Sequence, residues 1–90
     1  MANDLTTRER TLKALANKRR IAIVQYVKKQ KEASVGDIAE AIRLSFKATS
    51  KHLNILLAAG ILDREQKSLQ NFYRLDSDAT GFIRSLISIL

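Results

Sequence analysis

The 90-residue sequence contains no cysteine and no proline, and it has a single histidine. Without cysteine the chain can form no disulfide, no thiolate metal site and no thiol redox switch. One histidine cannot supply a histidine pair for zinc within one chain. The lack of proline fits a mainly helical chain with short turns.

Long apolar runs are also missing, since no stretch approaches the length that spans a bilayer. Residues 1–10 show no signal-peptide pattern, so we expect a cytoplasmic protein. Hydrophobic residues make up 46% of the chain, which indicates one folded domain rather than a disordered tail. The formal net charge is +7, which favours an anionic partner, either nucleic acid or an acidic membrane surface.

The most informative segment is residues 45–59, which predicts a helix with two different faces. Ser45 can cap its start by accepting backbone N–H groups. Gly60 can end it, because glycine takes the left-handed conformation at little cost. Thr49, Leu53 and Leu56 recur at helical spacing and should form a buried stripe.

The opposite face of this helix has small, polar or basic side chains, and residues 45–62 include no carboxylate. Such a face suits a DNA groove, which is lined by phosphates and whose bases are read by short side chains. The alternative is an ordinary solvated helix face. The candidate DNA contacts on this helix are Phe46, Lys47, Ala48, Ser50, Lys51 and Asn54.

Three further helices are predicted before this one. The first spans about residues 5–16 and can be capped by Asp4 or Thr6, and the second follows Asn17. The third follows Ser34, whose spacing to Asp37 matches a capping box. Only a short turn separates the third helix from the fourth, as in a helix-turn-helix unit.

After Gly60 the hydrophobic period changes to that of strands. Residues 61–65 and 71–75 predict a hairpin joined by residues 66–70, to which residues 33–35 can add a brief strand. A last helix is expected at about residues 77–90, starting at Asp76 or Ser77. The predicted order is therefore α-α-α-α-β-β-α.

Several short motifs occur in one order at residues 12–17, 20–21, 23–24, 34–39, 44–45, 50–53, 59–62 and 72–75. In this order and spacing the chain resembles the ArsR-like family of small winged helix-turn-helix transcriptional repressors. The resemblance implies a mainly α fold with a β-hairpin wing at about residues 61–75. It implies a recognition helix at about residues 45–59 in the major groove of DNA, and a homodimer joined through the first and last helices.

The candidate dimer contacts are apolar residues of the first and last helices, because their stripe is too apolar for the surface of one small monomer. They are Leu5, Leu12, Phe82, Ile83, Leu86, Ile87 and Leu90. The resemblance places the wing near the DNA backbone, so Arg64 and Lys67 are candidate phosphate contacts.

The chain departs from the family at the positions of metal ligands. Sensors of the family that use the third helix have cysteines near the positions of Val35 and Asp37, and those that use the last helix need histidine there. This chain has neither, so we expect no metal site and no cofactor.

Some residues allow two interpretations. Lys18 and Arg19 can contact phosphates or form a solvated face, and the same alternative holds more weakly for Lys28–Lys31. Phe46 can touch thymine methyl groups or close over the third helix. For His52 we expect packing against the core and a hydrogen bond to a backbone carbonyl rather than a sensing role.

These features predict a sequence-specific regulator that binds double-stranded DNA, as a homodimeric repressor without a metal-sensing site. The alternative is an architectural or protein-interaction module that does not read sequence. An enzyme is not expected, because no nucleophile–base arrangement, glycine-rich phosphate loop or catalytic carboxylate pair is present.

Overall fold

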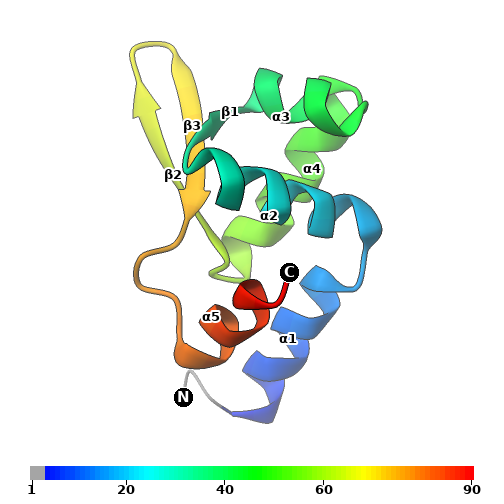
Figure 1. The fold of residues 1–90 in the computed structure, drawn as a ribbon, viewed down its shortest axis with the longest axis vertical. Helices are drawn as coiled ribbons and strands as arrows, with labels where there is room; N and C mark the ends of the chain where they lie inside the picture. Colours follow the sequence, from blue (N-terminus) through cyan, green and yellow to red (C-terminus); the bar gives the residue numbers. More distant parts are fainter. Residues whose placement is uncertain (1–3) are drawn as a thin grey trace.

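The computed structural model describes residues 4–90 and shows a winged helix-turn-helix fold. Its elements are α1 (Leu5–Leu15), α2 (Lys18–Gln30), β1 (Ala33–Ser34), α3 (Val35–Ile42), α4 (Phe46–Ala58), β2 (Leu62–Lys67), β3 (Gln70–Leu75) and α5 (Gly81–Ser88). The predicted order of helices and strands is confirmed, with β1 as the additional short strand. Helices α1 and α5 lie together at one end, and the hairpin projects from the other (Figure 1).

Four side chains begin helices as expected, because each accepts a hydrogen bond from a backbone N–H two or three residues further on. In α2, Asn17 Oδ1 accepts from the backbone N–H groups of Arg19 and Arg20 at 2.9 and 3.2 Å. The caps of α1, α3 and α4 are Asp4, Ser34 and Ser45. Gly60 follows α4 with a φ of 73°, so the predicted end of this helix is confirmed.

The sheet is antiparallel, with strand order β1-β3-β2. The hairpin loop is shorter than predicted, because the pairs Gln66↔Asn71 and Lys67↔Gln70 continue the ladder. Only Ser68 and Leu69 lie between the strands, and Ser68 adopts a φ of 58°. Two-residue hairpin turns require such positive φ values, which a serine adopts less easily than glycine or asparagine.

The last helix begins later than predicted, with Thr80 as its cap rather than Asp76 or Ser77. Asp76 instead organises a turn, in which its carboxylate accepts from the backbone N–H of Asp78 and its carbonyl accepts from that of Ala79. An aspartate can stabilise either a helix start or a turn of this kind, so the local sequence left both open.

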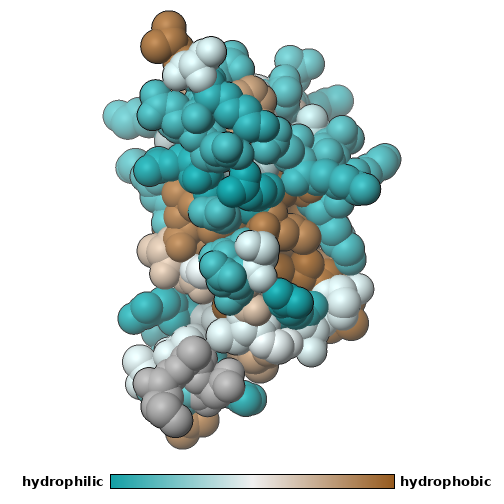
Figure 2. Space-filling model, turned by 90° about the vertical axis from the view of Figure 1, so that its left-hand side faces the viewer, coloured by the Kyte–Doolittle hydropathy of each residue, from teal (hydrophilic) through white to brown (hydrophobic). Residues whose placement is uncertain are grey.

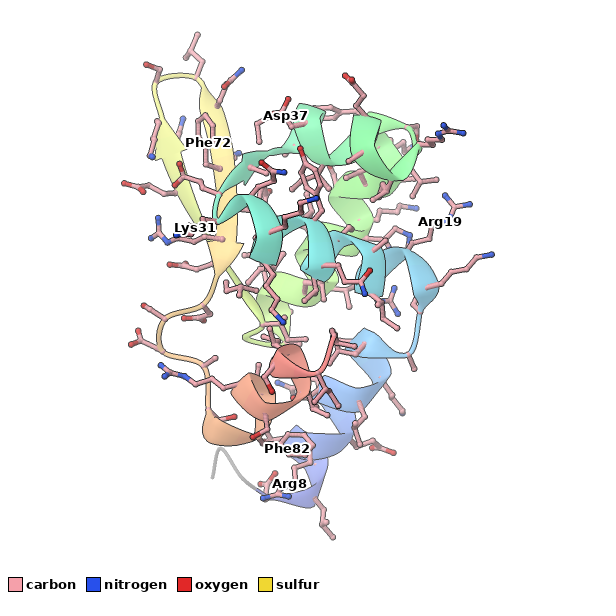
Figure 3. The ribbon with its side chains drawn as sticks, viewed as in Figure 1. Arg8, Arg19, Lys31, Asp37, Phe72 and Phe82 are labelled. Atoms are coloured by element: carbon pink, nitrogen blue, oxygen red, sulfur yellow. The ribbon has the colours of Figure 1, made fainter. Side chains whose placement is uncertain are left out.

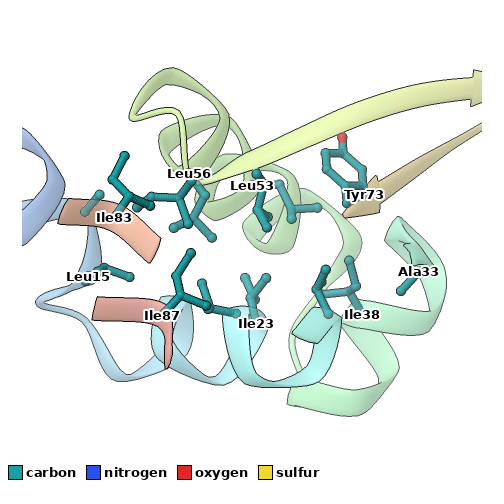
Figure 4. Packing of buried hydrophobic residues seen from close by; sticks show 14 of the residues in the cluster. Leu15, Ile23, Ala33, Ile38, Leu53, Leu56, Tyr73, Ile83 and Ile87 are labelled. Atoms are coloured by element: carbon teal, nitrogen blue, oxygen red, sulfur yellow. The ribbon is translucent and has the colours of Figure 1, made fainter. Parts of the chain in front are cut away.

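One hydrophobic core connects all the helices to the sheet. Leu53 and Leu56 of α4 are fully buried with Thr49, which confirms the predicted stripe. Ile83 and Ile87 of α5 point into the same cluster as Leu56 and Ile23 (Figure 4). No helix within residues 4–90 is long and apolar enough to cross a membrane.

Candidate nucleic-acid interface

Helix α4 follows α3 after a three-residue turn that fixes the angle between them. Arg43 ends α3 in the left-handed conformation with a φ of 57°, and the backbone N–H of Leu44 donates to the carbonyl of Ala39 at 3.0 Å. Helix α2 packs against α4 from one side, as Figure 1 shows. Leu53 and Leu56 of α4 are buried in the core, so only the opposite face of this helix is accessible to a partner.

The residues predicted to contact DNA from α4 lie on this accessible face. Phe46, Lys47, Lys51 and Asn54 are exposed, and Ala48 and Ser50 are half-buried. The described part of α4 contains no acidic side chain, so this face is positively charged. It combines cations, which bind phosphates, with a hydroxyl and an amide, which can hydrogen-bond base edges.

Arg20, at the start of α2, forms hydrogen bonds with residues of α1 and α4. Its Nε donates to the carbonyl of Ala14 at 2.6 Å and its Nη2 to that of Lys13 at 3.4 Å, both near the end of α1. Its Nη1 lies 3.1 Å from Nδ1 of His52 in α4. Arg20 thus satisfies carbonyls at the end of one helix and sets the position of another.

The prediction that His52 hydrogen-bonds a backbone carbonyl was wrong, because its ring forms a hydrogen bond with Arg20 instead. A guanidinium has no acceptor, so Nδ1 must accept and the proton of the neutral ring lies on Nε2. Burial lowers the pKa of His52, and the charges of Arg20 and Arg19 lower it further. The neutral ring is therefore favoured near pH 7.

We expect Arg20→Ala to lower the free energy of unfolding by about 1.5–3 kcal/mol, the usual range for hydrogen bonds to a charged group. The carbonyl of Ala14 and the His52 ring would lose the hydrogen bonds from Arg20, and the carbonyl of Lys13 would keep only its bond from the backbone N–H of Ala16. Urea unfolding followed by circular dichroism measures the change, and Lys18→Ala in the same turn is the control. Equal stability of the two variants would contradict the structural role of Arg20.

The remaining basic residues of α2 fall into two groups. Lys18 is exposed and Arg19 half-buried at the start of the helix, and Arg19 extends outward from the fold (Figure 3). Lys28 instead donates from Nζ to the carbonyls of Ile87 and Ser88 at 3.1 and 3.4 Å. A cation at the carboxyl end of α5 is favoured by the helix dipole, so Lys28 has a structural role.

The wing is less basic than its lysine and arginine residues suggest. Lys67 Nζ lies 2.8 Å from Glu32 Oε1, and this hydrogen bond raises the pKa of Lys67. Arg74 pairs with Glu65 and Asp63 on the neighbouring strand. Arg64 is exposed on β2. Glu32 was missed because it lies 35 residues from Lys67, beyond the reach of any local pattern.

The hydropathy of the molecular surface on the side of the wing changes from one end of the molecule to the other. Its upper part, over the hairpin, is mostly hydrophilic, and an apolar region lies below it (Figure 2). The tip is an exception, because the apolar residue Leu69 is 96% exposed there.

A second apolar surface lies on α1 and α5, away from the wing. Leu5 is 85% exposed and Leu12 is 50% exposed. With Phe82 they line a recess of about 550 Å³ that also includes Thr6, Arg8 and Glu9. The Arg8 guanidinium lies 4.7 Å from the centre of the Phe82 ring. Figure 3 shows these two side chains next to each other. We call this the α1–α5 face.

Not all the predicted dimer residues belong to this face. Ile83 and Ile87 are buried in the core of the protomer itself, so they are not available to a partner. Leu86 and Leu90 are half-buried and pack against the same core. The last helix therefore uses much of its apolar stripe within one chain, which the sequence alone did not show.

Residues 4–90 contain no group of three or more histidine, aspartate or glutamate side chains placed to hold a metal ion. The single histidine, His52, already bonds Arg20. The described surface thus includes the cationic α4 face, the hairpin and the α1–α5 face.

The fold and the polar, cationic face of its helix-turn-helix define a winged helix protein that binds DNA. Residues 17–64 match the family model described as bacterial regulatory protein, arsR family, and the chain belongs to this family. The resemblance seen in the sequence is therefore confirmed. Members of the family are regulators of transcription and not enzymes.

Two characterised relatives match most of the chain. The arsenical resistance operon repressor of Bacillus subtilis is 30% identical over 76 residues, which cover 83% of this chain and 72% of the relative. The transcriptional activator HlyU of Vibrio cholerae is 33% identical over 79 residues, which cover 88% of this chain and 69% of the relative.

Solved structures extend the similarity to the whole fold. HlyU from Vibrio cholerae superposes with a TM-score of 0.83 at 28% identity, covering 99% of this chain and 92% of that one. A homodimeric winged helix-turn-helix DNA-binding domain from Mycobacterium bovis gives a TM-score of 0.81 at 27% identity, covering 99% and 85%.

Proposed function

We propose that this regulator is a homodimeric repressor that recognises a specific sequence in double-stranded DNA. The observation that supports this most directly is the exposed face of α4, where Lys47 and Lys51 lie beside Ser50 and Asn54. The lysines suit phosphates, and the hydroxyl and amide suit base edges. Such a protein would act in the cytoplasm, where bacterial chromosomal DNA lies.

The proposed dimer is joined through the α1–α5 face. Exposed Leu5 and Leu12 form an apolar surface with Phe82 that a second copy would cover. The similar domain from Mycobacterium bovis is a homodimer, which supports the same assembly here. A two-fold dimer would place its two α4 helices in successive major grooves.

The supporting contacts lie outside α4. In the proposed complex, Lys18, Arg19 and Arg64 contact phosphates and Lys67 lies close to them, with its charge partly offset by Glu32. Phosphate contacts set register and affinity without reading bases. A change at one of them should weaken binding to all sequences alike.

Selection of bound sequences from a random DNA pool tests the proposal. We expect a palindromic site whose half-site centres lie about 10–10.5 base pairs apart, or a multiple of that distance. A salt titration with the selected duplex and with random duplexes then measures the specificity ratio. Equal affinity for both would favour the architectural module instead.

Repression follows if the bound dimer occupies a promoter. The repressor from Bacillus subtilis supports this direction, whereas HlyU is named an activator. A reporter gene under a promoter containing the selected site decides between them. Repression predicts that expression of this chain lowers reporter output, and an increase would contradict it.

We expect DNA affinity to be unaffected by zinc, cadmium, arsenite and thiol oxidants. Soft metals and trivalent arsenic need thiolates, and the sequence has no cysteine. Fluorescence anisotropy with the selected duplex measures the dissociation constant with each addition. A tenfold shift by micromolar zinc, reversed by a chelator, would reveal a metal site formed between subunits and would contradict this prediction.

A further inference from the structure

Phe46 is a large apolar side chain that the fold leaves uncovered. It is the first residue of α4 and is 64% exposed. Phe46 borders a recess with Val35 and Gly36 at the start of α3, but its large exposure argues against a role in closing over that helix. Leu44, which precedes the cap residue Ser45, already occupies the position of a hydrophobic staple and is half-buried. The fold itself therefore gives no reason for a phenyl ring at this position.

The position of Phe46 on α4 connects it to the residues that can read bases. Phe46, Ser50 and Asn54 are spaced four residues apart and so form one row along the helix. Lys47 and Lys51 form the neighbouring row. Phe46 thus begins the row that Ser50 and Asn54 continue, and it would enter the same groove.

A recess beside Phe46 is lined by residues of the start of α3 and of the hairpin tip. It has a volume of about 220 Å³, and Val35, Leu69 and Asn71 line it with Phe46. Phe46 is 64% exposed, so much of its ring stays accessible to a partner although it borders this recess. Phe46 is the residue through which α4 borders this recess.

We propose that Phe46 packs against the C5-methyl group of thymine in the major groove and so determines specificity at one position of each half-site. The proposal rests on the proposed DNA binding by α4. Among the four bases only thymine presents a methyl group in the major groove. A phenyl ring forms no hydrogen bond with base edges, and it gains most from contact with that methyl group.

Replacing single thymines of the selected site by deoxyuridine tests this contact, because the change removes only the methyl group. We expect one position per half-site at which wild-type affinity falls about fourfold, and by more than about tenfold when both half-sites are changed. Phe46→Ala should bind the thymine and uracil duplexes equally. Its salt dependence should match the wild type, because no charge is removed.

Leu69→Ala is the matched control, since it removes another exposed apolar side chain at the edge of the same recess. This variant should keep the preference for thymine over uracil. The proposal is overturned if wild-type protein is indifferent to every methyl group, or if Phe46→Ala keeps the preference. In either case binding to the selected site would stand. Failure to select any sequence would overturn both proposals.

Discussion

Leu12→Lys is expected to convert the dimer into a folded monomer and to weaken binding to the selected site by a factor of about one hundred or more. The two-fold axis would bring two new lysines into an apolar interface, where burying their charge is costly. A monomer engages one half-site and forgoes the gain from linking two binding events. Leu12 is 50% exposed and outside the core, so the protomer should still fold.

Light scattering coupled to size exclusion measures the mass, and anisotropy with the selected duplex measures affinity. Gln30→Lys is the control, because it adds the same charge at an exposed position outside the α1–α5 face. Leu86 is less suitable than Leu12, since it packs against the core and its replacement would also destabilise the protomer. A Leu12→Lys variant that remains dimeric would show that α1 is not part of the interface.

Asn54→Ala is expected to weaken binding to the selected site by at least about thirtyfold while leaving the fold intact. Removing a hydrogen-bonding side chain from a base edge costs about 1–3 kcal/mol, and the two-fold dimer incurs this cost in both half-sites. Asn54 is exposed, and alanine favours helix, so α4 should persist. Repeating the selection should show relaxed specificity at one position of each half-site.

Lys18→Ala provides the comparison, because Lys18 is proposed to bind a phosphate rather than a base. This variant should weaken selected and random duplexes alike and lower the salt slope by about one for each phosphate that is no longer neutralised. Asn54→Ala should leave that slope unchanged. If neither Asn54→Ala nor Ser50→Ala changes affinity for the selected site, α4 does not read the groove through this face.

Features that depend on neighbours in the chain were predictable from the sequence. Ser45, Thr49 and Gly60 define the start, buried stripe and end of α4 through interactions within about four residues. The cap by Asn17 is equally local. Since the accessible face of α4 follows from its buried stripe, the candidate groove residues also followed from the sequence.

Local sequence patterns did not predict the structure correctly in two kinds of case. In one, a residue type can stabilise two different structures. In the other, an apolar face can be covered either by its own chain or by a second copy. Asp76 forms a turn instead of starting α5. Ile83 and Ile87 fill the core of their own chain, although their spacing suits an intersubunit stripe equally well. Periodicity shows that a face is buried but does not show what covers it.

The family, the order of the elements and the polar, cationic face of α4 all follow from the sequence. The pairing of distant charges does not, and it depends on the folded chain. Lys28 binds the end of α5 about sixty residues away, Lys67 pairs with Glu32, and Arg20 joins α1 to His52. The residues next to a charged side chain in the sequence do not show whether it forms an ion pair or stays in solvent. Its partner is determined by which distant residues the packing of the chain brings close.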